Sequence, residues 1–160
     1  MSRIYVAYGS NLNMKQMADR CPTAKFLGTG VIENYELQFK GRLYNAHATI
    51  TPKPGAWVQV GLWAIEPMDE KRLDVYEGYP NYYFKQNVDV QVEGKTLRGM
   101  AYIMDQRMDF GYPTQRYYNT IYQGYKDCEF PVAELNKAVE QSMTQAEQRT
   151  QAQQFRMNLG

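Results

Sequence analysis

The sequence predicts an α+β protein in which a mixed β-sheet or small β-barrel forms the core and a few helices pack on it. Its 160 residues correspond to one domain of ordinary size with a single hydrophobic core. Strand-like segments follow one another along the chain, and helical segments separate only some of them. A doubly wound fold needs strict alternation of strands and helices, so this order favours the mixed sheet or barrel.

The composition is that of a globular protein without a strongly charged surface. Apolar residues make up 44% and charged residues 22% of the chain, and its net charge is +1. That charge provides no basic field for nucleic acid. The apolar run that ends at Gly9 is too short for a signal peptide, and no stretch approaches the roughly 18 apolar residues of a membrane span. We therefore expect a cytoplasmic protein with neither nucleic-acid nor membrane partners.

The N-terminal segment predicts a buried strand, a turn and a short helix. Residues 4–8 are apolar or aromatic throughout, and Gly9-Ser10-Asn11 interrupts them. Residues 12–20 have helical spacing, and Cys21-Pro22 ends that pattern. Ser10 or Asn11 is the expected N-cap, because both side chains accept hydrogen bonds from free backbone N–H groups.

The middle of the chain predicts a long strand-rich region followed by a helix. Residues 25–65 are strand-like, with turn signals at Gly41 and at residues 52–55, Pro-Lys-Pro-Gly. A helix is expected over residues 67–77, because it begins with proline and has acidic residues in its first turn. Gly78 is expected to close this helix in a left-handed conformation.

The last third predicts two strands and two helices. Alternating apolar residues indicate strands over 87–92 and 96–104, and a short helix is expected over 113–124. We divide the chain into a main domain, residues 1–130, and a C-terminal helix with a Gln-rich tail, residues 131–160.

Residue counts restrict the chemistry. The chain has one histidine, His47, and two cysteines, Cys21 and Cys128, without a CxxC motif. A disulfide framework, a structural zinc site and a metal site with several imidazoles are therefore not expected. A Ser–His–Asp triad would need His47, and no GxSxG motif accompanies it. We expect no metal, and the proton-transfer group of an enzyme with this sequence would be a carboxylate, a Lys or a Tyr.

The segment Tyr8-Gly9-Ser10-Asn11-Leu12 is the first candidate for a functional site. It lies between the predicted strand and helix, where glycine permits a tight turn. Free backbone N–H groups there suit a carboxylate or a developing oxyanion. The spacing matches no phosphate-binding loop. An ordinary strand–turn–helix corner is the alternative interpretation.

Glu77 is the second candidate. It lies four residues after Leu73, the expected core anchor of its helix, so both side chains share the inward face. Burial and the negative end of the helix dipole both disfavour its ionised form and raise its pKa above the usual value of about 4.3. A carboxylate in such an unfavourable place is a candidate functional group. The alternative is a surface or salt-bridged Glu near the end of a helix.

Tyrosines are in excess, with 14 in the chain. Many fall within residues 76–83 and 112–125. Tyrosine combines a rigid apolar ring with a polar tip, so most are expected to pack in the core or at its edge. Their clustering indicates that some line a polar pocket.

These motifs together resemble the γ-glutamylcyclotransferase family, also called the AIG2-like superfamily. The two principal ones are Tyr8-Gly9-Ser10-Asn11-Leu12 and Leu73-Asp74-x-x-Glu77-Gly78-Tyr79. Further matches occur in order over roughly residues 3–126: Arg20-Cys21-Pro22, Ala48-Thr49-Ile50, Pro80-x-x-Tyr83-x-Lys85, Pro113-Thr114-x-x-Tyr117 and Gly124-Tyr125. Two departures are Lys85, where the family often has Arg, and the Gln-rich tail, which has no counterpart.

The resemblance implies a small mixed β-barrel with flanking helices and a cofactor-independent reaction. A γ-glutamyl amine or γ-glutamyl amino acid would cyclise to 5-oxoproline and release its amine. The implied general base and acid is Glu77. The implied substrate-binding residues are Tyr8, Gly9, Ser10, Asn11, Tyr83 and Tyr117, with Tyr102 as a further pocket tyrosine.

The partner implied is thus a small γ-glutamyl substrate, and the protein would be a monomer or homodimer. The leaving amine is not identified by the sequence. The alternatives are a non-catalytic small-molecule-binding module of the same fold and a single-strand nucleic-acid binder with stacking aromatics. The near-zero net charge argues against the latter.

Overall fold

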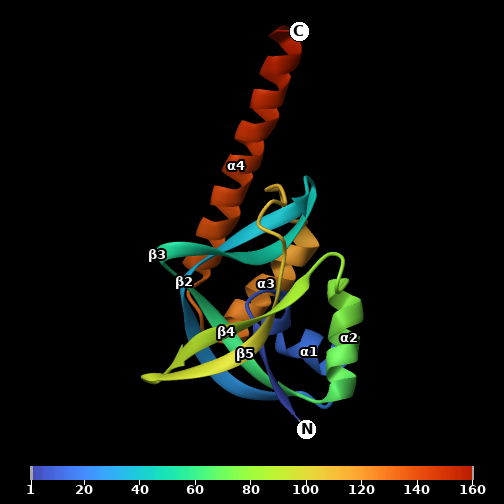
Figure 1. Cartoon of the computed structure of the whole chain (residues 1–160), viewed down its shortest axis with the longest axis vertical. Coiled ribbons are helices and arrows are strands. Elements are labelled where there is room, and N and C mark those ends of the chain that lie inside the picture. The colour runs from blue at the N-terminus through green and yellow to red at the C-terminus, as the bar shows by residue number, and fades with distance from the viewer. Residues whose placement is uncertain (1, 160) are drawn as a thin grey trace.

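The computed structural model describes residues 2–159 and contains a closed five-stranded barrel with strand order β1-β3-β2-β4-β5 (Figure 1). The strands are β1 (Arg3–Ala7), β2 (Lys25–Arg42), β3 (Asn45–Ile65), β4 (Phe84–Val92) and β5 (Lys95–Ile103). The helices are the 3-10 helix η1 (Ser10–Leu12), α1 (Met14–Arg20), α2 (Pro67–Glu77), α3 (Gln115–Asp127) and α4 (Val132–Leu159). The predicted fold, a small mixed β-barrel with flanking helices, is confirmed.

Strand β1 closes the barrel and makes it mixed. It pairs antiparallel with β3 from Arg3↔Ile65 to Ala7↔Gly61, and parallel with β5 at Tyr5↔Met100. A strand covered on both sides is continuously apolar rather than alternating, which explains the composition of residues 4–8. The chain leaves the barrel directly after β1 and enters η1, so this end of the barrel carries the segment Tyr8–Leu12.

The β2–β3 hairpin corrects one prediction. The residues expected to form a turn, 52–55, lie inside β3, so they do not end the strand. They do interrupt its pairing: Glu33↔Trp57 is followed by Tyr35↔Pro52, which leaves residues 53–56 of β3 opposite the single residue Asn34, whose φ is 63°. The Asn34 side chain accepts a hydrogen bond of 2.9 Å from the Gly55 N–H, so the residue types typical of a turn form a bulge in β3.

The expected N-cap of the first helix is also corrected. Asn13 caps α1, and its side-chain oxygen accepts a 3.0 Å hydrogen bond from the Gln16 N–H. Ser10 and Asn11 belong to η1 instead. Their side chains are therefore available for contacts with other parts of the fold.

The helices cover the barrel unequally. Helices α1 and α2 lie next to each other at one side, whereas α4 begins on β2 and then extends away from the body (Figure 1). Four residues of α4 are buried: Leu135, Ala138, Ser142 and Ala146. The Ser142 hydroxyl accepts a 2.9 Å hydrogen bond from the Phe39 N–H of β2. Within residues 2–159, no helix has both the length and the apolar character required to cross a membrane.

Candidate active site

Helix α2 ends at Glu77 because local signals define both of its ends. Pro67 occupies the first turn, and Glu66 and Asp69 form a capping box in which the Glu66 N–H donates to Asp69 Oδ2 at 2.9 Å. Gly78 closes the helix with φ 67°, as predicted. Leu73 is fully buried, so Glu77, four residues later, faces the barrel on the same side of the helix.

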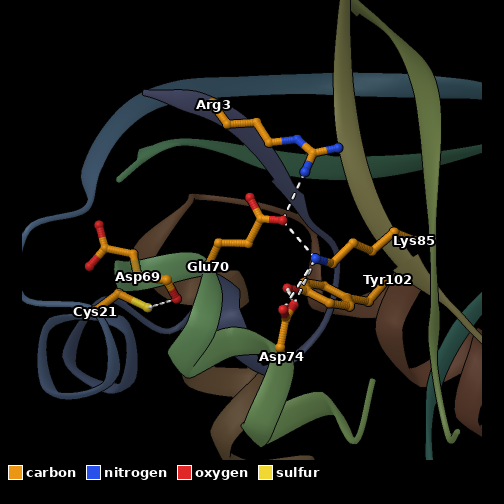
Figure 2. A network of polar contacts seen from close by, with 7 residues as sticks. All are labelled: Arg3, Cys21, Asp69, Glu70, Asp74, Lys85 and Tyr102. Atoms are coloured by element: carbon orange, nitrogen blue, oxygen red, sulfur yellow. Dashed lines mark hydrogen bonds and ion pairs between the residues drawn. The ribbon is translucent and has the colours of Figure 1, made fainter. Parts of the chain in front are cut away.

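A network of charged and polar side chains attaches α2 to the barrel (Figure 2). Glu70 accepts hydrogen bonds from Arg3 of β1 at 2.8 Å and from Lys85 of β4 at 2.6 Å. Lys85 Nζ also lies 3.0 Å from Asp74 Oδ1, and the Tyr102 hydroxyl of β5 donates to Asp74 at 2.6 Å. Three strands therefore fix the rotation of α2, and with it the direction of Glu77.

The carboxyl of Glu77 lies in the wall of a small pocket at this end of the barrel. The cavity measures about 20 Å³. Its lining contains every residue that the sequence singled out for the site: Tyr8, Gly9, Ser10, Asn11, Glu77, Tyr83 and Tyr117. It also contains Tyr5, Ala48 and Tyr102. Segments far apart in the sequence are thus brought together around one carboxyl group.

Burial raises the pKa of Glu77 from 4.5 to about 8, and the positive charge of Arg20 opposes this rise. The direction is the one expected from the sequence. Asn11 Nδ2 lies 3.5 Å from Glu77 Oε1, and among residues 2–159 no salt bridge neutralises the carboxyl. A carboxyl with a pKa near 8 is able both to accept and to donate a proton close to neutral pH.

The segment Gly9–Asn11 forms another part of the pocket wall. Gly9 permits its close approach to β3, because a Cβ there would lie 3.1 Å from Ala48 Cβ and 3.6 Å from the Tyr117 hydroxyl oxygen. The Asn11 carbonyl accepts a 3.1 Å hydrogen bond from Trp63 Nε1. The Ser10 hydroxyl lies 2.9 Å from that of Tyr76. These contacts hold the segment against both β3 and α2.

Four tyrosines of the pocket divide into two kinds by the role of their hydroxyl groups. Tyr8 donates its proton to the carbonyl of Tyr102, and Tyr83 donates to the carbonyl of Ala48 at 2.6 Å. By contrast, the hydroxyl of Tyr117 accepts from the Ala48 N–H at 3.0 Å, and that of Tyr5 accepts from Asn11 Nδ2 at 2.8 Å. The latter two hydroxyls retain a proton to donate.

Sequence reasoning missed Tyr5 as a pocket residue. In a regular strand, residues 5 and 8 face opposite sides, so strand alternation does not predict that both line one pocket. Strand β1 ends at Ala7 and Tyr8 lies outside it, and both Tyr5 and Tyr8 line the pocket. Burial raises the pKa of both hydroxyls far above 10, which keeps them protonated.

A larger cavity of about 260 Å³ adjoins the carboxyl and shares Ser10, Glu77, Tyr83 and Tyr117 with the small pocket. Its other walls are His47, Val75, Tyr76, Gly78 and Tyr82. Burial, and then the nearby charge of Arg42, lower the pKa of His47, so its ring is neutral at pH 7. His47 Nδ1 lies 2.9 Å from the Tyr82 hydroxyl. The cavity is thus mainly aromatic.

No group of three or more His, Cys, Asp or Glu side chains within residues 2–159 is arranged to hold a metal ion. Cys21 and Cys128 are both free thiols. The Cys21 sulfur contacts the carbonyl of Asp69 at the start of α2, at 3.6 Å (Figure 2).

Comparison with known proteins agrees with the fold and indicates the family. Residues 5–124 match the family model described as "Gamma-glutamyl cyclotransferase, AIG2-like". The chain is 28% identical to γ-glutamylcyclotransferase from Homo sapiens over 151 residues, which are 87% of this chain and 79% of that protein. It is 28% identical to the Mus musculus protein of that name over 148 residues, covering 86% and 78% of the two chains.

A solved structure of a γ-glutamyl cyclotransferase superimposes with a TM-score of 0.78 at 26% identity and covers 86% of both chains. The family model spans well over half of the sequence and includes both principal motifs. The chain therefore belongs to the γ-glutamyl cyclotransferase, AIG2-like family of enzymes.

Proposed function

We propose that this protein cyclises the γ-glutamyl group of a γ-glutamyl amine or γ-glutamyl amino acid to 5-oxoproline, with Glu77 as its single general base and acid. The observation that carries the proposal is the carboxyl of Glu77, whose pKa burial raises to about 8, in the wall of a pocket that Gly9–Asn11 and five tyrosines also line.

The reaction needs one group that first removes and then returns a proton. The α-amine of the substrate attacks its own γ-carbonyl carbon, and the new C–N bond closes the five-membered ring. Glu77 takes the proton that the amine loses and delivers it to the leaving nitrogen as the original amide C–N bond breaks. An α-amine titrates near pH 8, so a carboxyl of similar pKa exchanges protons with it at little cost.

Binding the substrate in a bent conformation supplies much of the acceleration by proximity. We assign the glutamyl half to the small pocket, where the backbone N–H groups of Gly9–Asn11 serve the oxyanion or the α-carboxylate. We assign the leaving group to the adjoining cavity of about 260 Å³. Its tyrosines and neutral His47 favour a semi-apolar leaving group.

The test is a panel of γ-glutamyl compounds assayed for release of 5-oxoproline. The panel contains γ-glutamyl amino acids with small and aromatic side chains, a γ-glutamyl alkylamine and glutathione. We expect release by the wild-type protein, fastest for semi-apolar leaving groups. Binding without turnover across the whole panel would contradict the proposal and favour a binding module.

Tyr117 is expected to act in substrate binding. Tyr117→Phe removes a hydroxyl that accepts from the Ala48 N–H and keeps a proton for the ligand. We expect the KM for the best panel substrate to rise by about tenfold, with a smaller decrease in kcat. Steady-state kinetics at several substrate concentrations measures both. A loss confined to kcat would instead assign Tyr117 to the chemical step.

A further inference from the structure

We propose that Tyr5 is a further catalytic residue, whose phenolic O–H donates a hydrogen bond to the reacting γ-carbonyl oxygen, and that Arg20 and Asn11 orient this donor. The proposal rests on the proposed function. It adds Tyr5, which the sequence motifs did not single out for the site, and it assigns a positioning role to Arg20 and Asn11.

The arrangement begins at Arg20, the last residue of α1. Its guanidinium group donates one hydrogen bond to Asn11 Oδ1 and another to Gln16 Oε1 at 2.8 Å. It also lies over the ring of Tyr76, 3.4 Å from the ring centre. Arginine has only donors, so the Asn11 side chain must present its oxygen to Arg20. The NH2 group of Asn11 is therefore turned away from Arg20.

Asn11 in turn fixes the orientation of the Tyr5 hydroxyl. Its Nδ2 donates to the Tyr5 hydroxyl oxygen at 2.8 Å, in a contact that is buried from solvent. Because Tyr5 accepts this bond, its own proton must point away from Asn11. The ring of Tyr5 packs edge-on against Tyr102 with their centres 5.8 Å apart, which restricts its movement.

In the part of the chain that the structure describes, the proton of the Tyr5 hydroxyl has no acceptor. Within residues 2–159, Asn11 is the one hydrogen-bond partner found for this hydroxyl, although Tyr5 is only 4% exposed. Buried hydroxyl donors are normally satisfied, and Tyr8 and Tyr83 are satisfied by backbone carbonyls. An unused donor in the wall of the pocket is therefore best explained by a ligand oxygen.

The position of Tyr5 relative to Glu77 identifies that oxygen. Asn11 Nδ2 lies 2.8 Å from the Tyr5 hydroxyl and 3.5 Å from Glu77 Oε1, so the donor and the carboxyl lie at the same side of the pocket. Glu77 serves the attacking amine, and the carbonyl oxygen is bonded to the carbon under attack. That oxygen gains negative charge in the transition state, where a fixed donor has its largest effect.

The primary test compares Tyr5→Phe with wild type in the 5-oxoproline assay. Loss of one oxyanion donor typically lowers kcat by 10²–10³-fold, and we expect about 100-fold here with KM changed much less. Tyr125→Phe is the matched control, since it removes a hydroxyl from a buried tyrosine of α3 outside the pocket. Circular dichroism and melting temperature verify the fold of both variants.

The second test asks whether Arg20 acts through Tyr5. Arg20→Met is measured alone and combined with Tyr5→Phe, at a pH where kcat no longer changes, so that ionisation of Glu77 does not contribute. We expect about a tenfold loss of kcat in the wild-type background and less than threefold in the Tyr5→Phe background. Equal losses in both would contradict an orienting role, because independent effects add.

The two proposals fail in different ways. A wild-type protein without 5-oxoproline release contradicts the proposed function, and the proposal for Tyr5 with it. An active wild-type protein together with a folded Tyr5→Phe variant of undiminished kcat contradicts the role of Tyr5 alone. If Tyr5→Phe does not fold, a full kcat in the Arg20→Met variant at the same pH also contradicts the proposal.

Discussion

Glu77→Gln is expected to lower kcat for 5-oxoproline release by about two to four orders of magnitude while the barrel remains folded. The amide keeps the shape of the side chain and its place next to Asn11, but it neither accepts the proton of the α-amine nor returns one to the leaving nitrogen. KM should change little, because the walls that hold the substrate are unaltered.

Single-turnover and steady-state assays with the best panel substrate measure this effect. Glu140→Gln is the matched control, since it makes the same chemical change on an exposed position of α4. It should retain wild-type kcat. A Glu77→Gln protein with near-normal kcat would exclude Glu77 as the proton-transfer group, even if the wild-type enzyme is active.

The same variant is expected to be more heat-stable than wild type at alkaline pH. Burial raises the pKa of Glu77 from 4.5 in the reference state to about 8 in the folded protein. The folded state therefore holds the proton more tightly than the unfolded state does. Its contribution to stability is complete below about pH 4.5 and is lost as the pH rises through about 8. The Gln side chain does not titrate in this range, so the variant has no such loss.

We expect melting temperatures of wild type and Glu77→Gln to be similar at pH 4.5. At pH 9 the variant should melt at least about 5 °C higher, since each pKa unit corresponds to about 1.4 kcal/mol and each kcal/mol to about 2–4 °C for a chain of this size. Thermal unfolding across this pH range tests it, and groups common to both proteins cancel in the difference. A constant difference at all pH values would contradict the raised pKa.

The same titration should govern the rate. If Glu77 must be ionised to accept a proton, kcat/KM should increase with pH up to about 8 and then level off. The α-amine of the free substrate loses its proton in a similar range, so kcat at saturating substrate, which depends only on ionisations within the complex, is measured beside kcat/KM. Ionisation of Glu77 is therefore expected to increase the rate and to lower the stability of the fold over the same pH range.

Elements defined by neighbouring residues were predicted correctly from the sequence. The helix over 67–77 has its predicted bounds, because a proline, a capping box and a glycine determine its ends within the segment itself. The predicted inward direction of Glu77 was correct for the same reason, since it follows from helical spacing relative to Leu73. The sequence also singled out those residues of the candidate site that belong to the motifs Tyr8–Leu12 and Leu73–Tyr79.

Features that depend on pairing between distant segments required the tertiary structure. Residues 52–55 have the composition of a turn, but they form a bulge within β3, because Pro52 and Trp57 on either side pair with Tyr35 and Glu33 of β2. Closure of the barrel depends on the pairing of Tyr5 with Met100, about 95 residues apart in the chain. No local signal determines either contact.

The sequence by itself determined the barrel-and-helix class, the main helix and the carboxyl at its end, because these depend on periodicity and on end signals within a few residues. Only the tertiary structure decided which tyrosine hydroxyls of the pocket donate their proton to a protein carbonyl and which keep it available for a ligand. That distinction depends on the direction of single hydrogen bonds between segments, such as those from Asn11 to Tyr5 and from Tyr8 to Tyr102, and residue type does not specify the direction.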